Sequence, residues 1–192
     1  MDAAHFVFAP FLGIVWCVER LFVKAPSGRQ RLNVLAALNA MTHEVWTVKN
    51  LTYITAETVC ELLSQLASAH AGIPLTIILD NARYQRCALV QTVANSFGIE
   101  LLYLPTYSPN LNLIERFWKF VKKQCLYSKY YPDSEAFQQA ISACIEQASS
   151  THKKALESLL TWRFQTFQNV PVMGGQHTVS NGSKKKVLSK AA

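Results

Sequence analysis

The chain has 192 residues, of which 50% are hydrophobic and 16% are charged, so it can bury a sizeable core and fits one domain with a short appendage. No apolar run reaches the roughly 18 residues that a membrane-spanning helix needs, and the first residues lack the positive charge of a secretory signal. The net charge of +7 favours a polyanionic partner.

The cysteines point to a reducing compartment. They number 5, are widely spaced and form no C-x-x-C pair. That pattern is typical of reduced thiols that fill the core of an intracellular protein. We therefore expect a cytoplasmic protein that does not associate with a membrane.

The first half of the chain predicts three strands and a helix. Residues 1–9 are apolar and extended in character, and residues 31–40 form a continuous apolar run typical of a buried strand. Residues 44–49 alternate and predict a hairpin partner for that strand. Thr55 can cap a helix, and the stretch that begins with Gly72 ends it.

The second half predicts alternating strands and helices. The strands are expected at residues 75–79 and 99–104. Helices are expected between Asp80 and Gly98, at about 111–126, from Pro132-Asp133-Ser134 onward, and at about 153–167. Leu89, Val93 and Phe97 lie at helical spacing in the first of these helices, which Gly98 ends. Strands that are joined through helices imply an α/β fold with parallel pairing and helices on the sheet faces.

Two acidic residues occupy positions that favour chemistry. Asp80 directly follows the apolar strand at 75–79, and Glu115 begins a helix after the next strand. Functional groups gather at the carboxyl ends of strands in such sheets, and Mg²⁺ takes carboxylate oxygens as ligands. Each acid also has an ordinary structural explanation, because Asp80 could form an Asx turn and Glu115 could pair with Lys119 one turn later. The pair together favours a metal site.

Two motifs resemble a known family. The first is Asp80-Asn81-Ala82-Arg83, and the second is Leu104-Pro105-x-Tyr107-Ser108-Pro109-x-Leu111-Asn112-x-Ile114-Glu115-x-x-Trp118. Together they closely resemble the catalytic domain of Tc/mariner-type insertion-sequence transposases of the DDE superfamily. The resemblance covers about residues 1–147 and implies an RNase H-like mixed sheet with helices on both faces, plus C-terminal helices. Leu113 departs from the family, which usually has Pro there.

The resemblance implies a third carboxylate on the first strand. Asp2 matches it, with Glu19 and Glu44 as the competing residues. Asp2, Asp80 and Glu115 would then be the catalytic residues and would hold two Mg²⁺ ions, with Mn²⁺ as a substitute. The family's reaction is metal-dependent hydrolysis at the transposon ends, followed by attack of the freed 3′-hydroxyl on target DNA.

Basic residues near these acids are candidate DNA contacts. Lys119 and Lys122 share a helix face with Glu115, and other candidates flank the acids: Arg83, Tyr84, Arg116 and Lys123. The alternative for the lysines is the ordinary charged face of an amphipathic helix. The expected partners are DNA, namely transposon ends and target, and either a second copy of the chain or a full-length transposase.

The expected organisation is a DDE catalytic domain at residues 1–150 with a truncated first strand, a C-terminal helix at 151–169 and a disordered basic tail at 170–192. Family members carry an N-terminal DNA-binding module, and only Met1 precedes Asp2 here. We therefore expect a truncated transposase whose activity is open to question. Two alternatives are a non-catalytic DNA-binding or regulatory fragment of a transposase, and a structure-specific nuclease on the same fold.

Overall fold

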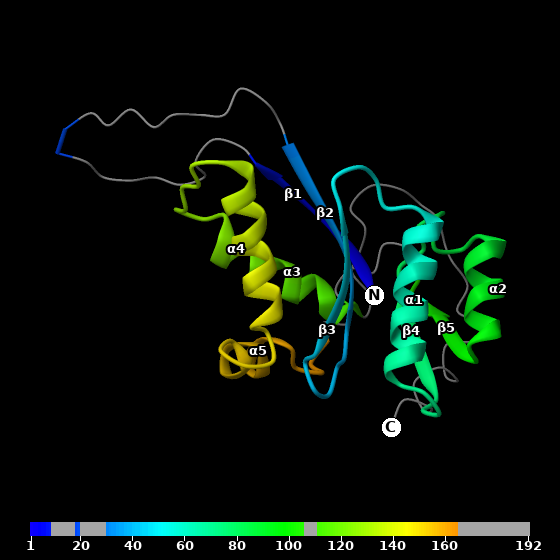
Figure 1. Cartoon of the computed structure of the whole chain (residues 1–192). Helices are drawn as coiled ribbons and strands as arrows, with labels where there is room; N and C mark the ends of the chain where they lie inside the picture. The colour runs from blue at the N-terminus through cyan, green and yellow to red at the C-terminus, as the bar shows by residue number, and fades with distance from the viewer. Residues whose placement is uncertain (9–17, 20–29, 106–110, 165–192) are drawn as a thin grey trace, which may run out of the picture.

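The computed structural model of the chain describes residues 1–8, 18–19, 30–105 and 111–164 (Figure 1). The strands are β1 (Asp2–Phe8), β2 (Gln30–Leu38), β3 (Val45–Asn50), β4 (Leu75–Leu79) and β5 (Ile99–Tyr103). The helices are α1 (Ala56–Ala69), α2 (Ala88–Ser96), α3 (Leu113–Cys125), α4 (Ser134–Glu146) and α5 (Lys153–Leu159). This order of strands and helices is the predicted one. No described helix has the length and apolar composition that crossing a bilayer requires.

The strands form two ladders. Strands β1, β2 and β3 pair antiparallel in that order, and Asp2 lies opposite Ala36 at the start of β1. Strands β4 and β5 pair parallel, with Leu75 opposite Ile99. The predicted hairpin of β2 with β3 and the predicted parallel pairing of helix-linked strands are therefore both confirmed.

Helices cover both faces of the β1–β3 ladder. Leu32, Val34 and Ala36 of β2 point to one face, where they pack in a core with α3, α4 and α5. Leu35 and Ala37 point to the other face, where the core includes α1 and α2. Figure 1 shows the same arrangement, with α3–α5 on one side of the ladder and α1 and α2 on the other. Strand β2 is buried on both faces, which explains its continuous apolar run.

Helices α3 and α4 bury the residues that their periodicity predicts. In α3 these are Ile114, Phe117, Trp118, Val121 and Cys125, and in α4 they are Phe137, Ile141, Cys144 and Ile145. The carboxylate of Asp133 caps α4 by accepting a hydrogen bond from the backbone N–H of Ala136 at 2.8 Å. Trp118 of α3 packs against Phe6 of β1, and Phe137 of α4 packs against Phe8 at the end of β1.

Helix α2 forms as predicted, and of its three apolar residues at helical spacing Val93 packs against the core while the other two are largely exposed. Val90 and Ala94 are buried, whereas Leu89 is 46% exposed and Phe97 is 44% exposed. Within the described part of the chain the helix packs mainly against α1 and β5, so a narrow stripe of side chains is enough to bury it. Helix α5 ends at Leu159, earlier than predicted, and residues 165–192, which include the predicted tail, lie outside the described part of the chain.

Among the described residues, helices cover one face of the β4–β5 ladder. Leu75, Ile77 and Leu79 pack with α1 and α2. On the opposite face Ile78 is 39% exposed and Leu102 is 41% exposed. The ladder that precedes Asp80 is therefore less enclosed than the ladder that carries Asp2.

Candidate functional site

Asp80 stands at the carboxyl edge of both parallel strands. It directly follows β4, and its Oδ1 accepts a hydrogen bond from the backbone N–H of Ala82 at 3.3 Å. The next residue, Asn81, donates from Nδ2 to the carbonyl oxygen of Leu104 at 2.6 Å, just beyond β5. The Asx-type contact expected from an ordinary structural role is present, and the same loop holds the carboxylate at the strand ends.

Asp2 opens β1 on the face that α3 covers. Side chains alternate along a strand, so Asp2 shares a face with Ala4 and Phe6, which pack in the core with α3. Burial raises the pKa of the Asp2 carboxyl. A hydrogen bond from the backbone of Ala3 lowers this pKa, and the negative charge of Asp80 raises it further. The two acids are therefore close enough to repel each other.

A hydrogen bond from the first residue joins the two ladders at this point. The amine of Met1 donates to the carbonyl oxygen of Ile78 at 2.6 Å. Burial lowers the pKa of this amine to about 6, against the opposing charges of Asp2 and Asp80. The bond brings the start of β1 beside the end of β4, and with them the two aspartates.

Glu115 adds a carboxylate from a third element. It lies in the first turn of α3 and is partly buried. Burial raises the pKa of its carboxyl most, the charges of Asp2 and Asp80 raise it further, and Lys119 lowers it. Three carboxylates from β1, the β4 terminus and α3 thus act on one another electrostatically.

The three carboxylates do not form a closed ligand set in this structure. Within residues 1–8, 18–19, 30–105 and 111–164, no three His, Cys, Asp or Glu side chains stand close enough to hold a metal ion. Their chemistry suits a hard divalent cation, which takes carboxylate oxygens. Such an ion would have to draw the side chains together.

The competing acids stand apart from this group. Glu44 is exposed in the turn between β2 and β3, where its Oε2 accepts a hydrogen bond from the Thr42 hydroxyl at 3.1 Å. Glu19 is exposed in the short described stretch 18–19. Neither contributes to the electrostatics of Asp2, Asp80 or Glu115.

Tyr84 lies closer to the acids than its sequence position suggests. Burial raises the pKa of its phenol to about 12, and the charges of Asp80 and Asp2 contribute. At neutral pH the hydroxyl is therefore protonated and can donate a hydrogen bond. Only its place four residues after Asp80 could have indicated this from the sequence, and the buried amine of Met1 was not foreseen at all.

Arg116 anchors the end of the described chain. Its guanidinium donates to the carbonyl oxygens of Thr161 and Arg163 at 2.8 Å each and to that of Leu159 at 3.4 Å. It also lies over the ring of Phe164, 5.4 Å from the centroid. Arg116 therefore serves the fold in this structure, and its predicted contact with DNA stays a prediction.

The remaining predicted DNA contacts are exposed. They are Arg83 in the loop after Asp80 and Lys119, Lys122 and Lys123 on α3. Lys119 lies near enough to Glu115 to lower the pKa of its carboxyl. The α3 lysines are thus available to a polyanion beside the acidic group, and none of these contacts is tested by the structure.

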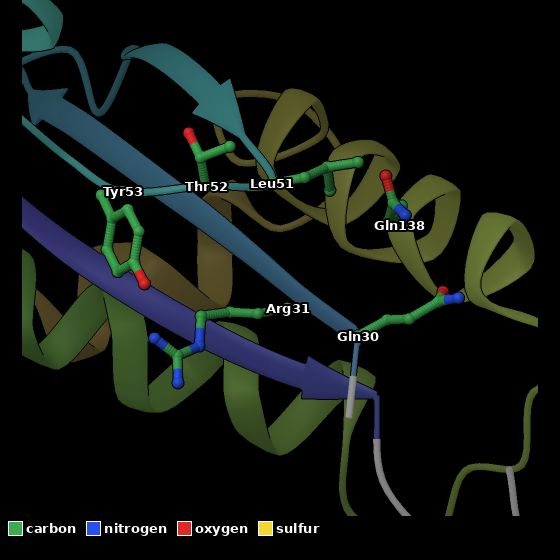
Figure 2. Close-up of a pocket in the computed structure, with 6 residues that line it drawn as sticks. All are labelled: Gln30, Arg31, Leu51, Thr52, Tyr53 and Gln138. Atoms are coloured by element: carbon green, nitrogen blue, oxygen red, sulfur yellow. The ribbon is translucent and has the colours of Figure 1, made fainter. Parts of the chain in front are cut away.

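A groove of about 640 Å³ lies at the other end of β2. In Figure 2 the side chains of Arg31 and Tyr53 lie near one another, while Gln30 extends toward Gln138 of α4. Gln30 pairs with Phe8 and Ala36 with Asp2, so roughly 20 Å of strand separates this groove from Asp2. No carboxylate lines it, and it is distinct from the acidic site.

A family model agrees with the two motifs. Residues 19–138 match the model described as DDE superfamily endonuclease. The matched stretch contains Asp80 and Glu115 and begins after Asp2. No curated protein matches the chain in sequence.

Solved structures share the fold. The chain is similar to the Mos1 transposase in its paired-end complex with the left transposon end, with a TM-score of 0.54 and 13% identity over 85% of this chain and 55% of that one. It resembles the Mos1 mariner paired-end complex with Mn equally well, with a TM-score of 0.54 and 10% identity over 87% of this chain and 55% of that one.

A viral integrase assembly is also similar. The simian T-cell lymphotropic virus intasome in complex with the PP2A regulatory subunit B56 gamma gives a TM-score of 0.50 and 17% identity over 91% of this chain and 58% of that one. At these identities the likeness concerns the fold, which is RNase H-like as predicted. The chain spans about 55% of the length of the Mos1 transposase.

Proposed function

The chain belongs to the DDE superfamily of endonucleases, and we propose on that premise that it is a transposase catalytic domain of the Tc/mariner type. Its substrate is DNA at the ends of an insertion sequence, which it cuts and joins to a target. The observation that carries the proposal is the match of residues 19–138 to the DDE superfamily endonuclease model, in a fold where Asp80 follows β4, Glu115 lies in the first turn of α3 and Asp2 opens β1. The cytoplasm is the proposed location, where the free cysteines among the described residues would stay reduced.

The proposed ligands are the same three carboxylates. DDE superfamily enzymes use divalent metals, and we propose two Mg²⁺ ions here, with Mn²⁺ able to replace them. When bound, such ions activate a water or a 3′-hydroxyl and stabilise the leaving oxygen of a phosphodiester. Burial is the main cause that raises the pKa values of Asp2 and Glu115, and repulsion among the free carboxylates adds to it. A bound cation relieves that repulsion.

The neighbouring residues have supporting roles in this proposal. Asn81 holds the loop of Asp80 against the end of β5 through its bond to the Leu104 carbonyl. The exposed lysines of α3, Lys119 among them, bind phosphates of the DNA backbone. The protonated hydroxyl of Tyr84 can donate a hydrogen bond toward the substrate or the acids. Each proposed role is supported by the exposure or the hydrogen bonds of the group concerned.

A non-catalytic role is the second candidate. In the described structure the three carboxylates are too far apart to hold one metal ion together. This spacing favours a fragment that binds DNA, or one that joins a full-length transposase and regulates it. A homodimer is the other assembly that we consider. Metal-dependent cleavage of DNA would distinguish the catalytic proposal from the DNA-binding role and from the regulatory role.

The test is nicking of a supercoiled plasmid by the purified full chain in Mn²⁺, because relaxation of the plasmid needs no knowledge of the transposon ends. We expect nicking in the parent and at least a hundredfold loss in Asp80→Asn and in Glu115→Gln, since electrostatic stabilisation of the transition state accounts for factors of about that size. Asp133→Asn is the matched control, because Asn caps a helix as well as Asp does. Folded parent protein that binds DNA without nicking it would favour the regulatory role.

A further inference from the structure

Among the described residues, α1 covers only part of one face of the β1–β2 ladder. Leu35 of β2 has no exposed surface and packs there in the core that includes α1. Alternate residues of a strand share a face, so Asn33 and Arg31 lie on the same face, closer to the start of β2. Arg31 is exposed, and so is His5, which lies opposite Asn33 on β1. This end of the face therefore presents an arginine and a histidine to solvent.

A buried asparagine fixes the loop after β3 beside these residues. Asn33 has no exposed surface, and its Nδ2 donates to the Thr52 carbonyl oxygen at 2.8 Å and to Asn50 Oδ1 at 3.1 Å. Asn50 Nδ2 donates in turn to the Tyr53 carbonyl oxygen at 2.8 Å. On the other side, Asn33 Oδ1 accepts a hydrogen bond from His5 Nδ1 at 2.6 Å. The backbone of this loop is thus held against the ladder.

The groove of about 640 Å³ lies between this loop, the start of β2 and α4. Arg31 is the one charged side chain among its described lining residues. The others with polar groups supply neutral donors, namely the amides of Gln30 and Gln138 and the hydroxyls of Thr52 and Tyr53. Figure 2 shows Arg31 near Tyr53, and Gln30 extended toward Gln138. One positive charge among neutral donors suits an anion that has several oxygen atoms.

The exposed side chains of the loop favour a long polyanion over a small anion. Tyr53 is 74% exposed although its backbone is fixed, and Leu51 is 61% exposed. A phosphate ion would leave both side chains in water, whereas a DNA strand would cover them, since bases stack on aromatic rings. Arginine, glutamine, threonine and tyrosine side chains are also common donors to the phosphate oxygens of DNA. The net charge of +7 agrees with such a ligand.

The groove is too far from the carboxylates to hold the phosphate that reacts. Arg31 lies opposite Val7, which is five residues beyond Asp2 on β1 and so roughly 17 Å from it. That length equals about five base pairs of duplex DNA. A contact in the groove would therefore position DNA without touching the reacting atoms.

We propose that this groove is a second DNA-contact surface, which holds the sugar–phosphate backbone of DNA outside the acidic site. Arg31 binds a phosphate oxygen, and the hydroxyl of Tyr53 donates to the same phosphate or to the next one. The hydrogen bonds of Asn33 and Asn50 keep the loop in place for this contact. The choice of DNA as the ligand rests on the proposed function, whereas binding in the groove needs neither a metal ion nor the carboxylates.

The experiment measures binding of a fluorescently labelled duplex of arbitrary sequence by anisotropy, with the full chain in EDTA, between about 50 and 200 mM salt. Arg31→Met keeps much of the length of the side chain and removes its charge. We expect it to weaken binding about tenfold and to lower the steepness of log Kd against log salt by about 0.9, which corresponds to one phosphate contact. The matched control is Lys154→Met, which removes an exposed charge at α5 and should stay within about twofold of the parent.

A smaller change and an NMR measurement locate the contact. Tyr53→Phe removes one hydroxyl from an exposed side chain and keeps the ring, and it should weaken binding about threefold. If Arg31→Met does not fold, this variant still tests the groove. In the parent, the backbone amide signals of Arg31, Thr52 and Tyr53 should shift when the duplex is added. They should stay in place when inorganic phosphate or polyglutamate is added at an equal concentration of charge.

The proposal is wrong if Arg31→Met and Tyr53→Phe both bind DNA as the parent does, or if Lys154→Met loses as much affinity as Arg31→Met. Shifts of the same amides with polyglutamate would make an acidic peptide the ligand instead, and shifts with inorganic phosphate would indicate a site for a small anion. Failure of the proposed function has a different result, namely no plasmid nicking in Mn²⁺ while Arg31-dependent binding of DNA in EDTA persists.

Discussion

The two ladders of this protein differ in how completely they are enclosed. The β1–β3 ladder has helices on both faces, and residues of its central strand such as Val34 and Leu35 have no exposed surface. The β4–β5 ladder has α1 and α2 on one face, while the other face exposes Ile78 and Leu102. The first unit contributes buried residues to both apolar cores of the described structure. The second ends in Asp80 and has described helices on one face.

The acidic site lies where the enclosed ladder and the open ladder meet. Asp2 belongs to the enclosed ladder and Asp80 to the open one, and the bond from the Met1 amine to the Ile78 carbonyl joins them. Carboxylates that repel one another are tolerated at functional sites because the rest of the fold supports them. The comparison implies that stability depends on the enclosed unit and that the site depends on how the two units meet.

The largest effect is expected from the enclosed unit. Phe117 has no exposed surface and packs between the helices and β1 and β2. Phe117→Ala should lower the free energy of unfolding by about 3–5 kcal/mol, measured by urea denaturation. The matched change on the open face, Leu102→Ala, should cost no more than about 0.5 kcal/mol. Similar losses of unfolding free energy in the two variants would contradict the view that stability depends mainly on the enclosed ladder.

A divalent ion should bridge the two units. At an Mn²⁺ concentration of 100 times Kd, binding to the native state alone stabilises it by about 2.7 kcal/mol, seen as a rise in Tm. Asp80→Asn should remove this rise and, in EDTA, melt at or above the temperature of the parent because a repulsive charge is gone. Asp133→Asn should retain the rise. A parent whose melting does not respond to Mn²⁺ would remove the support for a metal site.

A smaller effect is expected where α3 holds the C-terminal segment. Arg116→Met removes the donors to the carbonyls of Thr161 and Arg163 and should cost about 1 kcal/mol, since the guanidinium is partly exposed. The amides of residues 159–164 should then exchange faster, with little change elsewhere. The control is Lys123→Met, a similar change at an exposed position of the same helix. Unchanged exchange in the Arg116 variant would show that packing alone holds this segment.

The smallest effect is a pH dependence from Asp2. Its pKa in the folded protein lies above the ordinary value of 3.8, chiefly through burial. The associated stability is therefore fully present below about pH 3.8 and is lost as pH rises through the folded pKa. In EDTA, the parent should lose stability relative to Asp2→Asn as pH rises from about 4, measured by urea denaturation. The Met1 amine, whose pKa burial lowers to about 6, acts in the opposite direction. Because the charge of Asp2 raises the pKa of that amine, the difference between the two proteins reports Asp2 together with its coupling to the amine. Parallel pH profiles would contradict the expectation.

The sequence by itself determined the elements and the family. The strand at Leu75–Leu79 has the bounds that the apolar run predicts, and α3 buries the face that its periodicity predicts. Asp133 caps α4 as its position before the helix suggests. These features depend on residues within a few turns of one another, where side-chain spacing and capping chemistry act directly. The motifs around Asp80 and Glu115 indicated the superfamily for the same reason, because each motif is a contiguous stretch of sequence.

Only the tertiary structure decided how the site is assembled. The bond between Met1 and Ile78 joins residues 77 positions apart, and it brings Asp2 to Asp80. The guanidinium of Arg116 donates hydrogen bonds to carbonyl oxygens more than 40 positions away. Helix α2 buries Val90 and leaves Leu89 exposed. Such choices depend on which surfaces pack against one another after the elements have formed. Local periodicity contains no information about them, because the energy that selects them comes from contacts between distant segments.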